Sequence, residues 1–599
     1  MKINKFLAAI CLTALLFLTA CESPPVIPPD ENGKTNDGSE EITSKTDDWQ
    51  YDYSTYSKDG YFQPRTYSGD VMPMAMEAMA PPTGGNLGFS VGGAKDVGNF
   101  RENIEQGYLP IPTDITYEGL FYGYFFDTGA QEKCEKLFCP SYSTAISTDP
   151  LSKEEKYFLS VGLNSGIKES DFQRKKLNLV VVLDISGSMG SPFDQYYYDR
   201  FGNYVETGDD PFESSKSKME IANRAVVDLI GHLKDEDRFG MVLFDDSAYP
   251  AKPLSKVKNT DMQAIKNHIL QIEDQGGTNM EAGMEEGLKL LKEYQNANPE
   301  EYENRIIFIT DAMPNTGDTS EKGLMGMVKN NASNNIYTTF IGVGVDFNTQ
   351  LIEILTKTKG ANYYSVHSEK EFKKTMDEGF DYMVTPLVFD LKLQLEAEGY
   401  EIEKVYGSPE ADEATGEIMY VNTLFPSKTE EGQVKGGLVL LQLKKTSESG
   451  KLNLKVSYED RNGKKDGDEK EIRFTNLEPD TYPNTGIRKG ILLTRYAGLM
   501  RAWAMEGHDN HRRPEPRPMP CPIIIMERGI YPPEPPFMPP CFPWPILGEW
   551  ERQSVPLTVD ENYSNLFKEF VAHFKTEKSA IGDDTLEREL ELLEKLARE

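Results

Sequence analysis

Three short motifs place oxygen-bearing side chains where a buried strand ends or a helix is about to begin. In VVLDISGSMG a run of branched apolar residues stops at Asp184, Ser186 and Ser188. GGTNM puts Thr278 after two glycines, and RIIFITDAMPN ends its apolar run just before Asp311. Hydroxyls with a few carboxylates suit a hard divalent cation such as Mg²⁺, which takes about six oxygen ligands. A serine nucleophile and a simple polar turn are the alternatives.

An alternation of strands and amphipathic helices over residues 175–384 would position these motifs. LNLVVVLDIS and RIIFIT are continuous apolar runs, as expected of strands covered on both faces. KMEIANRAVVDLIGHL carries a helical apolar stripe that includes Met219, Ala222 and Leu229. The alternation predicts a doubly wound, mainly parallel α/β sheet. Ligands of such sheets bind beyond the carboxyl ends of the strands, so the motifs would meet at one edge.

The order DISGSM, GGTN and ITDAMPN on this alternation resembles the von Willebrand factor A (VWA) domain and its metal-ion-dependent adhesion site (MIDAS). The resemblance implies that Ser186, Ser188 and Thr278 bind the cation directly. Asp184 and Asp311 would act through water. Mg²⁺ is the expected ion, with Mn²⁺ or Ca²⁺ as alternatives. Neutral hydroxyl ligands leave the cation electron-poor, so an open coordination position would favour an Asp or Glu carboxylate of a partner protein.

Two departures from the family pattern lie beside the site. Ala312 follows Asp311 where the family usually has glycine, and its small side chain predicts a slight effect. Residues 190–216 form an insert rich in Tyr and Asp. The insert is either a partner-selecting cap, with carboxylates of its own that could occupy the open position of the site, or a surface loop.

A wider resemblance covers residues 90–510. NFRENIEQGYLP and ITYEGLFYGYFFD, with the regions that follow, look like bacterial VWA lipoproteins described as homologues of calcium-activated chloride-channel accessory proteins. The resemblance implies a metal-dependent binding or adhesion protein and does not imply a channel. An envelope scaffold with a structural metal is the alternative. Hydrolysis is disfavoured, because SGSMG is not the Gly-x-Ser-x-Gly elbow and no histidine lies near these serines in sequence.

The first residues look like a bacterial lipoprotein signal peptide. Lys2 and Lys5 precede an apolar stretch that ends in LTAC. We expect cleavage after residues 1–20 and attachment of lipid, palmitate included, to Cys21. The chain would then be anchored by lipid on the extracytoplasmic side of a bacterial membrane, as part of the cell envelope. An ordinary signal peptide is the alternative, and no later segment is long and apolar enough to span a bilayer.

The cysteines left after this processing are Cys134, Cys139, Cys521 and Cys541. An even number in an oxidising compartment predicts disulfides, and the pairs 134–139 and 521–541 are the local choice. A zinc site that joins the last two cysteines to His508 and His511 is the alternative.

The net charge of the chain disfavours some classes of binding partner. Acidic residues outnumber basic ones 97 to 64, which gives a formal net charge of −33. A field of that sign repels nucleic acid and anionic lipid headgroups. We therefore expect an unidentified protein as the partner, no nucleic acid, and contact with the membrane only through the lipid anchor.

At 599 residues the chain is long enough for several domains. The expected order is a signal peptide, a flexible tether, an N-terminal subdomain, the VWA domain, a small antiparallel β-sandwich and a helical C-terminal region with a proline-rich insert. In the same order the boundaries are 1–20, 21–88, 89–174, 175–384, 385–478 and 479–599, with the proline-rich insert at 512–546.

Overall fold

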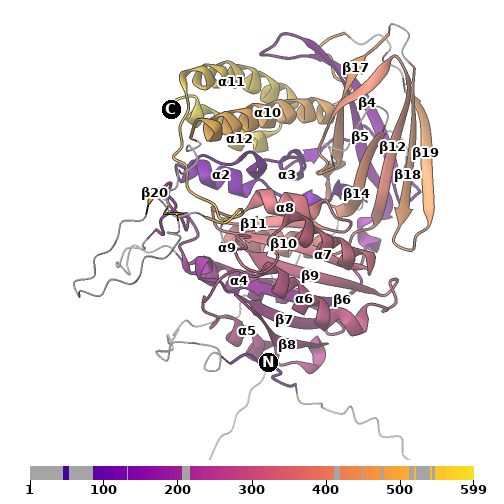
Figure 1. Ribbon diagram of the computed structural model, residues 1–599. Helices are drawn as coiled ribbons and strands as arrows, with labels where there is room; N and C mark the ends of the chain where they lie inside the picture. The colour runs from indigo at the N-terminus through magenta and orange to yellow at the C-terminus, as the bar shows by residue number, and fades with distance from the viewer. Residues whose placement is uncertain are drawn as a thin grey trace, which may run out of the picture. The chain divides into compact units, whose positions relative to one another are not determined.

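The computed structural model describes most of the chain beyond residue 44 (Figure 1). The described residues are 45–52, 85–130, 133–205, 216–367, 369–410, 418–447, 451–472, 474, 478–511, 519–520, 540–541 and 547–599. The expected signal peptide, Cys21 and Cys521 lie outside these ranges.

A seven-stranded sheet forms the centre of the expected VWA region. Its order is β2-β11-β10-β9-β6-β7-β8, and neighbouring strands are parallel except β7 and β8. The strands are β2 (Gly93–Ala94), β6 (Lys176–Asp184), β7 (Arg238–Phe244), β8 (Ala248–Lys256), β9 (Tyr302–Thr310), β10 (Ile336–Val343) and β11 (Asn362–Val366). β6, β9 and β10 are buried along almost their whole length, as the continuous apolar runs predict.

Helices cover both faces of this sheet. Successive residues of β6 show this, because Val181 and Leu183 pack with α4, α5 and α9, whereas Val180 and Val182 pack with α6, α7 and α8. The helices are α4 (Lys218–Ile230), α5 (Met262–Ile269), α6 (Met280–Leu291), α7 (Glu321–Ser333), α8 (Thr349–Thr356) and α9 (Glu369–Met383). The result is the doubly wound α/β fold that the alternation predicts.

A nine-stranded antiparallel sheet is assembled from two distant parts of the sequence. Its order is β13-β17-β5-β1-β14-β12-β18-β19, with β4 beside β5. The strands are β1 (Asn86–Val91), β4 (Cys139–Thr148), β5 (Glu155–Lys168), β12 (Val388–Glu398), β13 (Tyr400–Tyr406), β14 (Ile418–Ser427), β17 (Leu438–Lys445), β18 (Lys451–Asp460) and β19 (Lys465–Ile472). Phe138, next to β4, packs edge-on against Tyr458 of β18 with ring centroids 5.6 Å apart. The two halves of the sheet therefore face each other across one apolar core.

This arrangement differs from the expected division into a subdomain at 89–174 and a separate β-sandwich at 385–478. β1 and β5 lie between β17 and β14, so the two segments share one sheet. Without β1 and β5, β17 and β14 would each present an unpaired edge, which backbone hydrogen bonding disfavours. The rest of the N-terminal segment forms α2 (Gly98–Glu105), α3 (Tyr117–Tyr122) and the edge strand β2 of the VWA sheet.

Helices α10 (Thr485–His511), α11 (Glu561–Ile581) and α12 (Glu587–Leu596) form the C-terminal region and pack on α2 and α3 (Figure 1). Glu589 of α12 is fully buried, and it accepts hydrogen bonds from Arg101 of α2 and, at 2.9 Å, from the hydroxyl of Tyr124. Within the expected proline-rich insert, the described residues form only the short pair β20 (Met519–Pro520) and β21 (Pro540–Cys541).

Part of the expected flexible tether is held against the VWA domain. The Gln50 amide donates to the Ala251 carbonyl of β8 at 2.8 Å, and Trp49 stacks on His268 with ring centroids 5.3 Å apart. Tyr51 is buried. Burial of these aromatic side chains explains why residues 45–52 are ordered against the domain. Residues 53–84 of the expected tether lie outside the described ranges.

Cys134 and Cys139 form the expected disulfide just before and at the start of β4. The second expected pair and the zinc alternative both involve Cys521, which the structure does not describe. None of the helices within the described ranges has the length and hydropathy needed to cross a membrane.

Candidate metal site

The three sequence motifs meet at the carboxyl edge of the parallel sheet. Asp184 ends β6, Asp311 follows β9, and these two strands are parallel neighbours. The Thr310 hydroxyl donates to Asp184 Oδ2 at 2.5 Å, which joins the two strand ends. The Gly187 amide donates to the Gly276 carbonyl at 3.0 Å and ties the serine loop to the GGTN loop. The loops that carry all five expected ligands are thus in contact.

The serine loop presents its hydroxyls together. The Ser186 amide donates to Asp184 Oδ1 at 2.9 Å, and the Ser186 and Ser188 hydroxyl oxygens lie 3.1 Å apart. Asp311 Oδ1 is buried and has no hydrogen-bond partner among the described residues. A buried carboxylate oxygen without a partner is costly, so this atom fits a cation or a cation-bound water. The donor set therefore suits a divalent cation.

Two glycines allow the GGTN loop to approach this edge. Gly276 adopts φ +70°, and a Cβ on Gly277 would lie 2.5 Å from Asp246 Oδ1. The backbone can take this path only without side chains at both positions. Thr278 is held there because its amide donates to Asn315 Oδ1 at 3.0 Å. Asn279 then caps α6 through the Ala282 amide.

A buried lysine lies at the centre of the site, and the sequence analysis missed it. Lys218 Nζ is 3.0 Å from Asp311 Oδ2 and 2.6 Å from Asp346 Oδ1, with all three side chains fully buried. Ser217 and Glu220 form a capping box that starts α4 at this residue. Two signals in the sequence point to this pair. Lys218 lies on the apolar face of its helix, four residues before Ala222, and Asp346 follows the end of a strand as Asp184 and Asp311 do.

The electrostatics of this edge favour a divalent cation. Asp184, Asp311 and Asp346 are buried at this edge, and one ammonium, that of Lys218, pairs with Asp311 and Asp346. Two negative charges remain when all four groups are ionised. Burial, and then the neighbouring Asp311, raise the pKa of Asp184. Burial also raises the pKa of Asp311, although Lys218 opposes this. In the described part of the chain no three His, Cys, Asp or Glu side chains form a metal cluster, so a cation here depends on the hydroxyls.

The site is closed to solvent. Asp184 and Asp311 are 0% exposed, Ser186 1%, Thr278 2% and Ser188 8%. Part of the cover is the insert, because the Tyr197 amide donates to Asp346 Oδ2 at 2.9 Å and the Tyr196 side chain is buried. Within residues 190–205 the insert is an ordered cap, and residues 206–215 lie outside the described ranges.

A second cover comes from residues 547–556, which we call the strap. The Tyr198 hydroxyl of the insert donates to Glu551 at 2.7 Å, and Arg552 donates to the Phe347 carbonyl at 2.6 Å. Trp550 is 3% exposed and donates from Nε1 to the Thr319 carbonyl at 2.7 Å. The strap therefore joins the C-terminal region to the metal edge of the VWA domain, which the sequence did not indicate.

Alanine at position 312 has a larger energetic cost than its small side chain predicts. It is fully buried and has φ +57°, in the left-handed region. This conformation costs a residue with a Cβ about 1–2 kcal/mol, and glycine avoids the cost. The expectation of a slight effect considered only the volume of the side chain and did not include the backbone conformation.

Comparison with known proteins identifies this region. Residues 178–378 match the family model of the von Willebrand factor type A domain. Inter-alpha-trypsin inhibitor heavy chain H1 of Mesocricetus auratus is 22% identical over 301 residues, covering 49% of this chain and 28% of that protein. Heavy chain H4 of Homo sapiens is 22% identical over 247 residues, covering 41% and 23%. The chain thus spans about a quarter of the length of these curated relatives.

Solved structures show weak overall likeness. A von Willebrand factor type A protein from Catenulispora acidiphila gives a TM-score of 0.40 at 15% identity, covering 64% of this chain and 83% of that one. The ArnB paralog VWA2 from Sulfolobus acidocaldarius gives 0.35 at 14% identity, covering 77% and 97%. The family model shows that the chain contains a VWA domain. The relatives named above are inter-alpha-trypsin inhibitor heavy chains, and the resemblance to chloride-channel accessory proteins stays a prediction.

Proposed function

From the VWA domain at residues 178–378, a module of protein–protein interaction and adhesion, we propose that this chain is a metal-dependent binding protein of the cell envelope. The observation that carries the proposal is the convergence of hydroxyls and carboxylates on one buried edge, with Asp311 Oδ1 left without a partner. Ser186, Ser188 and Thr278 would hold the cation directly. Asp184 and Asp311 would act through water.

Mg²⁺ is the proposed ion, and Mn²⁺ and Ca²⁺ are the alternatives. The cation supplies a Lewis-acidic position that attracts an anionic oxygen, for which a partner's Asp or Glu side chain is the simplest source. Because the insert and the strap cover the edge, a partner reaches it only after part of this cover moves. Binding by this route is coupled to opening of the cap.

Placement in the envelope rests on the sequence of residues 1–21. We propose that Cys21 carries the lipid anchor described above, with the folded region held outside the cytoplasmic compartment. The disulfide between Cys134 and Cys139 supports an oxidising environment.

We propose binding and not catalysis. The Ser186 hydroxyl lies against another hydroxyl, and the adjacent Asp184 accepts from the Ser186 amide and from Thr310. These contacts are typical of a cation site and differ from a nucleophile paired with a general base.

A second candidate is an envelope scaffold in which the metal is structural. The burial of all five ligands favours it, because a structural ion needs no access for a partner. The two candidates differ in the expected effect of metal removal. The binding protein would lose association with its partner, whereas the scaffold would lose folding stability.

The test compares wild type with Asp184→Asn, and with Asp235→Asn as the control. Asp235 is exposed and lies before β7, at the opposite edge of the sheet. Capture of partners from envelope extract is measured with Mg²⁺ and with EDTA, and thermal unfolding is measured under the same conditions. Metal-dependent binding predicts that EDTA or Asp184→Asn weakens capture at least about tenfold.

A large fall in melting temperature with unchanged capture would favour the scaffold. The absence of any effect of Mg²⁺ on either measurement would contradict both candidates.

A further inference from the structure

A cavity of about 350 Å³, whose lining includes none of the five expected metal ligands, lies where several parts of the chain meet. Its walls come from α2 and the turn after α3, from β11 and α9, and from α12. The segment around β15 (Thr429–Glu430) and β16 (Gln433–Lys435) closes the remaining side. We call this cavity the basic pocket.

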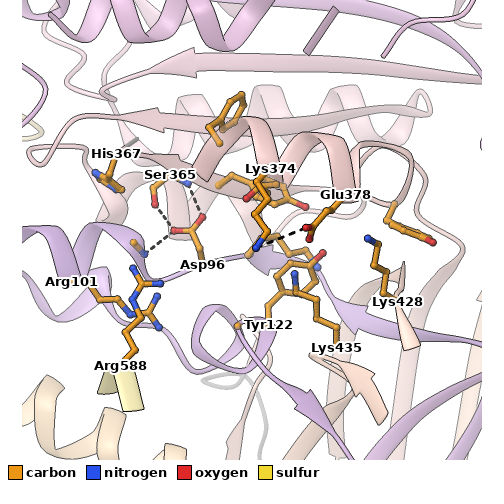
Figure 2. A pocket seen from close by; sticks show the side chains of 18 residues that line it. Asp96, Arg101, Tyr122, Ser365, His367, Lys374, Glu378, Lys428, Lys435 and Arg588 are labelled. Atoms are coloured by element: carbon orange, nitrogen blue, oxygen red, sulfur yellow. Dashed lines mark hydrogen bonds and ion pairs between the residues drawn. The ribbon is translucent and has the colours of Figure 1, made fainter. Parts of the chain in front are cut away.

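Cationic side chains dominate the pocket lining, although the chain as a whole carries a net charge of −33. The cations are Lys95, Arg101, Lys374, Lys428, Lys435 and Arg588. Figure 2 shows Arg101 and Arg588 at one end of the pocket and Lys428 and Lys435 at the other. The positive charge is therefore spread around the cavity and does not belong to one element.

The acidic residues of the lining do not balance this charge. Asp96 is held by the Ser365 amide at 2.8 Å and the Gly98 amide at 2.9 Å, and Glu378 lies 4.0 Å from Lys374. Arg101 is paired with Glu589, outside the lining. The remaining four cations make no ion pair with any residue in the described ranges. These four are Lys95, Lys428, Lys435 and Arg588.

Two of these cations face one aromatic ring. Lys95 Nζ lies 4.6 Å and Lys435 Nζ 4.9 Å from the centroid of Tyr122. Lys95 is 3% exposed and donates to the Ser90 hydroxyl at 3.0 Å and to the Val91 carbonyl. Burial lowers the pKa of Lys95 to about 7; Glu118 opposes this lowering and Lys435 adds to it. An anion bound between the two ammonium groups would favour the charged form of both.

We propose that the basic pocket binds a small ligand through a phosphate or carboxylate group held among Lys95, Lys428, Lys435 and Arg588. The cavity volume is at the lower end of the range for small-molecule sites, about 300–1,000 Å³, so the ligand is a small molecule and not a polymer. Its oxyanion accepts charge-assisted hydrogen bonds from ammonium and guanidinium groups. Because α12, α9 and the β15–β16 segment all contribute, the ligand also links these elements.

The test is isothermal titration of the full chain with sodium pyrophosphate in one arm and citrate in the other, at equal ionic strength and with EDTA present. EDTA separates this site from the metal edge, so failure here leaves the proposed function untouched. We expect saturable binding in at least one arm, and the arm that binds more tightly identifies phosphate or carboxylate as the ligand chemistry.

The variants are Lys428→Gln/Lys435→Gln and, on the exposed face of α12, Arg588→Gln. Lys329→Gln on α7 is the control, because Lys329 is an exposed lysine that does not line the pocket. We expect about a tenfold loss of affinity in the double variant and a smaller loss in Arg588→Gln, while the control is unchanged. Absence of saturable binding in both arms, or equal affinity in all variants, overturns the proposal.

Discussion

Lys218 determines the electrostatics of the metal edge. Its ammonium lies between Asp311 and Asp346, and all three groups are withdrawn from water. Removing one partner of a buried ion pair leaves the other charge without compensation, which is far more costly than breaking an exposed pair. The stability of this edge in the absence of metal therefore depends on a residue outside the expected ligand set.

We predict that Lys218→Met lowers the free energy of unfolding by about 3–5 kcal/mol, measured by urea denaturation in EDTA. Lys289→Met is the control, because the Lys289 side chain is 64% exposed and pairs with Glu286 on the surface. Its expected cost is at most about 1 kcal/mol. Equal effects of the two substitutions would contradict the role of Lys218.

Glu589 predicts a pH dependence. Burial acts to raise the pKa of Glu589, but Arg101, Tyr124 and Tyr496 outweigh it, so the pKa lies below its ordinary value of 4.5. A carboxyl group with a lowered pKa contributes stability above its unfolded pKa and loses it as the pH falls through the folded pKa. Stability supplied by Glu589 is thus complete at neutral pH and is lost below about pH 4.5.

Glu589→Gln should therefore be less stable than wild type at pH 7 by about 3 kcal/mol, because Arg101 loses its partner. The difference should shrink as the pH falls below about 4.5. Glu591→Gln, an exposed position on the same helix, serves as the control. Thermal unfolding across this pH range measures both, and a difference that is constant with pH would argue against the assignment.

Single residues show how far sequence can predict the site. Asp184, Ser186 and Ser188 were found because oxygen side chains follow an apolar strand, and Asp346 follows the same rule but was not recognised. Lys218 was not among the predicted site residues, although its spacing places it on the buried face of its helix. The conformation of Ala312 could not be predicted, because a positive φ depends on the loop that surrounds it.

At the scale of elements, the strap connects two regions that the sequence keeps apart. Trp550 and Arg552 follow the proline-rich segment, and local composition gives no signal that they contact the VWA domain. Helices of the VWA domain were predictable from their apolar period, and its central strands from continuous apolar runs. A segment without regular secondary structure has no apolar periodicity, so its contacts cannot be predicted from the sequence pattern and are seen only in the structure.

We predict that Trp550→Ala releases the strap. Loss of a buried indole costs about 3–5 kcal/mol, and released residues become accessible to protease. In limited proteolysis, the Trp550→Ala variant should be cut within residues 547–556 faster than wild type. Trp550→Phe keeps an aromatic ring but loses part of the buried indole and the hydrogen bond to the Thr319 carbonyl. It should therefore cost at least about 1 kcal/mol but less than Trp550→Ala, and protease should cut it more slowly than Trp550→Ala. Identical digestion of both variants and wild type would show that the strap does not depend on this side chain.

At the scale of the whole molecule, the antiparallel sheet makes two distant segments depend on each other. β1 and β5 precede the VWA domain, and their neighbours β14 and β17 follow it. Period-two alternation predicted strands at residues 385–478, whereas no strands were predicted in the segment before the VWA domain. Alternation also carries no information about the partner strand. The expected separate sandwich therefore differs from the shared sheet that the structure shows.

We predict that residues 385–478 expressed alone do not fold cooperatively, because β14 and β17 lack their neighbours. Residues 86–599, which restore β1 and β5 with the VWA domain between the two halves and keep the C-terminal helices that cover α2 and α3, should fold. Amide proton dispersion in NMR spectra and denaturant titration distinguish the two outcomes. A cooperative transition in the shorter fragment would contradict the shared core.

The attachment of residues 45–52 to the β8 edge bears on the reach of the folded region above a membrane, under the proposal that Cys21 carries lipid. If lipid holds Cys21, the chain between the lipid and residue 45 comprises residues 21–44, about 24 residues, for which a fully extended chain would measure about 80 Å. The expected tether of about 68 residues would have allowed about 240 Å. Under that proposal a partner of the metal edge would have to come within this shorter distance of the lipid surface, because the contacts of Trp49 and Gln50 with the VWA domain fix where the anchored segment ends.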